Sequence, residues 1–308
     1  MFTMPVLLSC SLALWLFVTI AGGVCEDTAS SYDVSSNIWT RIGTLACYLL
    51  SAFLLNSIHL FERRVGWLFS LFMWLVVLTV FVLYRLDVAL SVLILVASFS
   101  ILFSSQLALD VERRLFALFA LLGSSIFLAP AIFLFLPVFA VFAYASNILT
   151  VKRLFAMLLG LVTPFWLAFG LAYVYEPAGV LFGGMKPFFS GLALFAFLPE
   201  SHILLFMAAE LLVLVPASVL LLGSSLPGKP LLRRRVLFFL LLNVYVLFLS
   251  FVVPNRSEFF YACSIPGTTV LVSYIFTSKI TKLSNIYFIF VNLIWIILAL
   301  YCLWMGLF

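Results

Sequence analysis

Residues 115–147 read LFALFALLGSSIFLAPAIFLFLPVFAVFAYASN, and the way this uncharged stretch crosses a membrane decides the fold. As one α-helix its 33 residues would be about 50 Å long at about 1.5 Å per residue, well beyond a hydrocarbon core of about 30 Å. Pro130 and Pro137 offer a break, because proline removes a backbone donor and clashes with the preceding turn. The alternative to one long helix is therefore a pair of short helices, at about 114–128 and 131–147.

The distribution of Lys and Arg distinguishes these alternatives, since cytoplasmic loops carry an excess of both residues. With two helices the basic residues divide 12 to 4 between the two sides, whereas one helix gives 6 to 10. The pair of helices is therefore predicted. The smaller group, on the outer side, is Arg41, Arg85, Lys186 and Arg256. The larger group, on the cytoplasmic side, is Arg63, Arg64, Arg113, Arg114, Lys152, Arg153, Lys229, Arg233, Arg234, Arg235, Lys279 and Lys282.

The composition of the whole chain agrees with a lipid environment. Of its 308 residues 66% are hydrophobic and 9% are charged, with a mean hydropathy of +1.32, whereas soluble domains carry about 25% charged residues. The net charge of +5 comes from short runs between apolar stretches and not from a basic domain, so no nucleic-acid partner is expected. The predicted partner is the lipid bilayer.

Other apolar stretches of about the length needed for one crossing bring the prediction to eleven spans. We interpret the first stretch as a retained span, because it has neither a basic start nor an A-x-A cleavage site. Residues 178–199 contain Lys186 and Pro187, and their crossing would move Arg233–Arg235 outside, so they are predicted to be re-entrant or interfacial. Besides the pair above, the predicted spans are 5–24, 37–59, 66–83, 87–105, 154–174, 201–222, 234–253, 259–277 and 286–306.

The predicted fold is thus an all-α, polytopic transmembrane helical bundle forming one integral-membrane domain over residues 1–308, with the N-terminus cytoplasmic and the C-terminus outside. Five cysteines without a CxxC spacing and two histidines give no metal site. Motifs for nucleotide binding are also missing, so no cofactor is expected.

Glu210 is the acidic residue placed within a predicted span. An ionised carboxylate at the centre of a membrane helix costs about 2.5–3.5 kcal/mol on insertion scales, so such a residue suggests a proton carrier or a substrate ligand. A neutral glutamate that is hydrogen-bonded across a helix interface fits the sequence equally well. Both interpretations stay open here.

A second group of polar residues is predicted at the outer face. Glu26 and Asp27 directly follow the first span, where a carboxylate can act as a general base. Arg256 and Lys186 are candidates for holding a lipid phosphate, with Tyr261 close to Arg256 in sequence. The alternatives are a solvated acidic loop and an Arg256 that simply pairs with the nearby Glu258.

Two pairs of sequence phrases resemble a known family. Val111–Phe116 leads into Gly123–Pro130, and Thr150–Phe155 leads into Gly160–Phe165. Both look like an uncharacterised multi-span family of inner-membrane proteins of Bacteroidota, catalogued as a domain of unknown function. The resemblance implies a bacterial inner-membrane location and no particular activity.

A weaker likeness is to integral-membrane glycosyltransferases that use polyprenyl-phosphate sugars. They carry an acidic residue in the first outer loop, where Glu26 and Asp27 stand, and commonly an outer arginine for the lipid phosphate, as Arg256 could be. This chain lacks their large first outer loop.

Three functional hypotheses follow. The first is handling of a lipid-linked cell-envelope glycan precursor at the outer face, with Glu26 or Asp27 as base and Arg256 and Lys186 on phosphate. The second is a proton-coupled transporter or flippase that uses Glu210. The third is a non-catalytic subunit that packs against membrane-protein partners.

Overall fold

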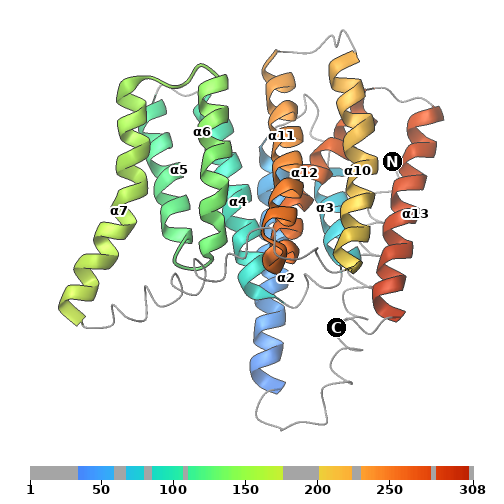
Figure 1. Cartoon of the computed structure of the whole chain (residues 1–308), viewed down its shortest axis with the longest axis horizontal. Coiled ribbons are helices and arrows are strands. Elements are labelled where there is room, and N and C mark those ends of the chain that lie inside the picture. Colours follow the sequence, from blue (N-terminus) through green and yellow to red (C-terminus); the bar gives the residue numbers. More distant parts are fainter. Residues whose placement is uncertain are drawn as a thin grey trace.

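The computed structural model describes residues 34–58, 67–79, 85–106, 110–175, 201–223, 230–278 and 282–304. Within these ranges the chain is helical and contains no strand, and Figure 1 shows the helices running side by side as a bundle. The predicted span 5–24 and the predicted re-entrant segment 178–199 lie outside the described residues. In chain order the helices are α2 (Val34–Ser57), α3 (Trp67–Leu78), α4 (Leu86–Ser105), α5 (Val111–Ser125), the 3-10 helix η2 (Pro130–Phe135), α6 (Leu136–Ala145), α7 (Val151–Tyr175), α10 (Ser201–Gly223), α11 (Pro230–Val252), the 3-10 helix η3 (Pro254–Arg256), α12 (Ser257–Ser278) and α13 (Lys282–Trp304).

The stretch 115–147 contains two helical segments and not one long helix. Helix α5 ends at Ser125, and a turn with hydrogen bonds from Leu128 N to Ser125 O (3.0 Å) and from Phe127 N to Ser124 O (3.3 Å) follows. Pro130 starts η2, where its missing N–H leaves no hydrogen bond unmade. The chain then returns through α6, and Figure 1 shows that the turn between α5 and α6 lies at one end of both helices.

Three of the described helices are long and apolar enough to cross a membrane: Leu86–Ser105, Val151–Leu171 and Leu232–Val252. Shorter apolar helices cover Leu68–Leu78, Pro130–Ala145, Ile203–Val219 and Ile286–Tyr301. Together with the composition, these helices indicate a membrane protein.

Helix α12 lies at the centre of the bundle, against α10, α11, α3 and α4. Every residue from Phe259 to Ile275 is buried, including Ser264, Thr268 and Thr269. Hydroxyl groups are placed inside a membrane bundle because a neighbouring helix can hydrogen-bond them there and lipid cannot. This hydroxyl-bearing stretch of α12 therefore faces protein on all sides.

Helix α7 lies at one edge of the bundle in Figure 1 and packs on α5. Its outer side chains are apolar and exposed, with Trp166 77% exposed and Phe155 60% exposed. Two glycines allow a close approach of the two backbones. A Cβ on Gly123 would lie 2.9 Å from Leu161 O, and one on Gly160 would overlap Phe116 O, as in small-residue packing of membrane helices.

Polar contacts identify which helix ends meet. At one end, Arg235 of α11 donates from Nε to Gln106 Oε1 (3.3 Å), just after α4, and Gln106 Nε2 donates to Ser146 Oγ (3.4 Å), just after α6. We call this the basic end, because Arg113, Arg153 and Arg235 all lie there. At the opposite end, Arg85 before α4 pairs with Glu258 at the start of α12.

Candidate functional site

Glu210 of α10 is 1% exposed and points at the central helix α12. Ser264 Oγ donates to its Oε2 (2.9 Å), and Thr268 Oγ1 donates to its Oε1 (3.0 Å). Ser264 and Thr268 are one helical turn apart, so they present both hydroxyls on one face of α12. Among the described residues no basic side chain forms an ion pair with Glu210.

Asn243 of α11 extends this cluster to a third helix. Its Nδ2 donates to Thr268 Oγ1 (3.1 Å), while its Oδ1 is buried without a hydrogen-bond partner. Gly267 makes room for the amide, since a Cβ there would overlap Oδ1 and lie 2.9 Å from Cγ. An unpaired buried acceptor costs about 1–3 kcal/mol, so Asn243 is held at this contact at a cost in stability.

The two hydroxyls can serve Glu210 in either protonation state. Ser264 Oγ lies 2.7 Å from Tyr261 O, and Thr268 Oγ1 lies 3.1 Å from Ser264 O, in addition to their contacts with the carboxyl group. Each hydroxyl has one proton to donate. When Glu210 is ionised both protons can go to the carboxylate; when it is protonated it can donate to a hydroxyl, which then donates to a helix carbonyl. The arrangement can therefore bind and release a proton without leaving the carboxyl group unpaired.

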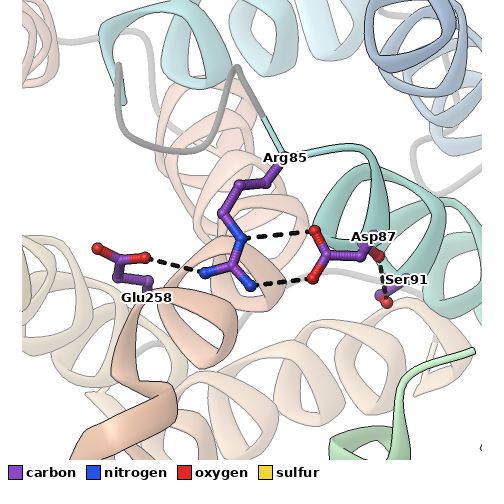
Figure 2. Close-up of polar contacts among 4 residues, drawn as sticks. All are labelled: Arg85, Asp87, Ser91 and Glu258. Atoms are coloured by element: carbon purple, nitrogen blue, oxygen red, sulfur yellow. Dashed lines mark hydrogen bonds and ion pairs between the residues drawn. The ribbon is translucent and has the colours of Figure 1, made fainter. Parts of the chain in front are cut away.

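A second polar cluster lies at the end opposite the basic end (Figure 2). Arg85 donates to Asp87 from Nη2 (2.9 Å) and from Nε (3.4 Å), and to Glu258 Oε2 from Nη1 (3.1 Å). The hydrogen bond with Asp87 is the main reason why the pKa of Arg85 lies above its ordinary value. Ser91 Oγ donates to the backbone oxygen of Asp87 (2.7 Å). This cluster joins the start of α4 to the start of α12, which is a structural role.

The predicted outer-face residues lie in several places. Glu26, Asp27 and Lys186 are outside the described residues. Arg256 is exposed and forms no ion pair with any described residue, since Glu258 pairs with Arg85 instead. Tyr261 is 3% exposed, and its ring centroid lies 5.4 Å from that of Phe206. Substrate binding by Arg256 and Tyr261 stays a prediction.

An apolar groove lies on the surface between α10 and α11, with a volume of about 450 Å³. Phe248 on its wall is 58% exposed and Leu211 is 50% exposed, so the groove is open along the side of the bundle. It reaches the last turn of α11, from which η3 leads to Arg256. The lining residues are Leu204, Met207, Ala208, Leu211, Leu247, Phe248 and Phe251.

The sequence reasoning identified Glu210 but missed its partners on α11 and α12. Asn243 is the signal that could have found them, because an amide in an otherwise apolar stretch needs a polar partner on a neighbouring helix. The structure shows that two residues of the stretch 264–269, Ser264 and Thr268, lie against Glu210. In the part of the chain that the structure describes, no group of acidic, His or Cys side chains could hold a metal ion.

No protein-family model, no curated protein and no solved structure matches the chain. The roles of these sites therefore rest on their geometry.

Proposed function

We propose that this chain is a multi-pass protein of a bacterial inner membrane, with about eleven spans, its N-terminus cytoplasmic and its C-terminus outside. The grouping of Arg113, Arg153 and Arg235 at one end of the bundle supports this topology, because cationic side chains remain in the cytoplasm. Arg85 and Glu258 meet at the opposite end, which is the outer face in this assignment. The kinship with the family of Bacteroidota stays a proposal.

Its function, in this proposal, is to handle a lipid-linked phosphate substrate at the outer face, such as a polyprenyl-phosphate-linked glycan precursor of the cell envelope. The observation that supports this proposal is the position of the open apolar groove. The residues at its end are close along the chain to Arg256, an exposed arginine without an ion-pair partner among the described residues. The groove would take part of the apolar chain of the lipid. Arg256 would hold its phosphate, which a guanidinium group can bind through two parallel hydrogen bonds.

The remaining roles in this function rest on the sequence. Lys186 would be a second phosphate ligand, and Glu26 or Asp27 would be the base that activates an acceptor hydroxyl. Tyr261, which is close to Arg256 along the chain, would be a further substrate-binding residue. These assignments require the four side chains to approach the end of the groove.

Photocrosslinking of the full-length purified chain with a polyprenyl-phosphate probe tests the proposal. Ala208→Trp should fill the groove and Arg256→Gln should remove the phosphate ligand, so each variant should lose most of the labelling. Arg114→Gln at the basic end is the matched control and should label like the parent chain. Equal labelling of all four proteins would refute the proposal.

A second candidate function is proton-coupled transport or lipid flipping, and the Glu210 cluster favours it. A buried carboxyl group whose hydrogen bonds can be satisfied with or without its proton is suited to carrying that proton. Proton release on substrate addition, measured in weakly buffered proteoliposomes, should disappear in Glu210→Gln and persist in Arg256→Gln if this candidate is correct.

The two sets of variants also address the third hypothesis. Three results together would identify a non-catalytic subunit. The probe does not label the chain, the chain releases no proton, and its variants complement a deletion strain as well as the parent does. Its apolar surface would then contact membrane-protein partners.

A further inference from the structure

We propose that a charged pocket at the basic end binds the zwitterionic headgroup of an aminophospholipid. The pocket lies where α5 and α7 begin, and it has a volume of about 310 Å³. This is ample for a headgroup, since one water takes up roughly 30 Å³ in the liquid. Its lining consists of Asp110, Val111, Glu112, Arg113 and Arg153.

The four charged side chains of the pocket are not paired with one another. Among the described residues none of them forms an ion pair, although two cationic and two anionic groups share one pocket. Asp110 stands at the start of α5 without capping it through its side chain. A pocket that holds opposite charges apart complements a ligand that also carries both charges.

Arg153 is held in a fixed position in the lining of the pocket. Its Nη1 donates to Ile148 O (2.7 Å), which fixes the guanidinium group, while its Nε is buried and has no hydrogen-bond partner. A phosphate oxygen is the acceptor that a guanidinium group binds best. The first turns of α5 and α7 meet here as well, and helix N-termini favour anions.

Asp110 and Glu112 would bind the ammonium group of the ligand. A primary ammonium group has three N–H donors, which the two carboxylates can accept. A quaternary ammonium group has no such donor, and an uncharged glycerol headgroup offers no cation. The pocket therefore fits a phosphate linked to a primary amine, as in phosphatidylethanolamine.

The surroundings favour a lipid over a free small molecule. Below the pocket, α7 exposes the apolar side chains of Phe155, Leu158 and Leu159 on the outside of the bundle. Acyl chains would run along this surface while the headgroup occupies the pocket at the level of the helix ends. The site lies at the end of the bundle opposite Arg256, so it does not rest on the function proposed above.

Native mass spectrometry of the delipidated full-length chain tests the proposal by titration with three lipids of identical acyl chains. We expect phosphatidylethanolamine to bind about fivefold more tightly than phosphatidylcholine or phosphatidylglycerol, as a difference of about 1 kcal/mol produces. Free phosphoethanolamine, as a competitor, should displace the lipid weakly or not at all. Equal binding of the three lipids would overturn the proposal, and complete displacement by free phosphoethanolamine would overturn its lipid part.

The double variant Asp110→Asn, Glu112→Gln separates recognition from general lipid affinity. Removing both carboxylates leaves two arginines, so the preference should change from phosphatidylethanolamine to the anionic phosphatidylglycerol. Arg114→Gln removes a charge from the same helix without touching the pocket lining and should keep the parent preference. A double variant that folds, as judged by its thermal unfolding, and retains the parent preference would refute the assignment.

Discussion

Replacement of Gly160 by alanine should destabilise the chain, although alanine is the better helix former. A Cβ at this position would overlap the carbonyl oxygen of Phe116 and lie 3.1 Å from its carbonyl carbon and 3.2 Å from Ala120 N. All three atoms belong to the backbone of α5, so no change of rotamer can relieve the clash. The two helices must move apart instead.

The expected magnitude is the difference between two effects. Overpacking of a close contact costs about 1–3 kcal/mol, and a rigid helix backbone places this contact at the upper end. Alanine in place of glycine stabilises the helix itself by about 1 kcal/mol. The net loss should be about 1–2 kcal/mol, or about 1.5–3 °C in Tm for a chain of this size.

Gly170 supplies a matched control on the same helix, because nothing lies within 4 Å of a Cβ there. Thermal unfolding in one detergent, followed by tryptophan fluorescence, should show a lower Tm for Gly160→Ala and no loss for Gly170→Ala. If the two variants unfold at the same temperature, or if Gly160→Ala is the more stable one, then α5 and α7 do not pack backbone to backbone as the structure has them.

Further variants test the two polar clusters and the topology. Glu210→Gln keeps hydrogen-bonding groups at the same place and should unfold within about 0.5 kcal/mol of the parent, whereas Glu210→Ala leaves buried hydroxyls without this partner and should lose about 1–3 kcal/mol; equal stability of both would contradict the cluster. A double-mutant cycle with Arg85→Met and Glu258→Gln should give a coupling free energy of about 0.2–1 kcal/mol in low salt, because the pair is partly exposed. A coupling of zero would show that the pair does not stabilise the contact between α4 and α12. Single cysteines at residues 150 and 230 of a cysteine-free chain should react with a membrane-impermeant reagent only after cell lysis, and labelling of either in intact spheroplasts would refute the proposed topology.

Long apolar stretches made the helices predictable, and charged residues limited the accuracy of their ends. The predicted span 259–277 differs by at most two residues at either end from α12, Ser257–Ser278. By contrast, the span predicted to begin at residue 234 belongs to a helix that begins at Pro230. The four omitted residues include Arg233, which hydropathy excludes from a span although the helix includes it. Arg235, inside the predicted span, donates hydrogen bonds to Gln106 and to the backbone oxygen of Phe103.

The contacts between helices were much less predictable than the helices themselves. Glu210 is conspicuous because any carboxylate in an apolar stretch is conspicuous, but its partners are 54 and 58 residues further along the chain. Arg85 and Glu258 are 173 residues apart. Local pattern carries no information about which helix faces which, so these pairings required the packed bundle.

The depth of Glu210 can be derived from α11 without any reference to hydropathy. Asn243 touches the hydroxyl that serves Glu210, and it lies eight residues after Arg235 at the basic end and eight before Phe251 at the other end of the helix. At about 1.5 Å per residue, the cluster is about 12 Å from each of these positions. It therefore lies near the middle of the bundle, where an ionised carboxylate is most costly. Two hydroxyls and a buried amide at this depth keep the carboxyl group hydrogen-bonded where water and lipid headgroups cannot do so.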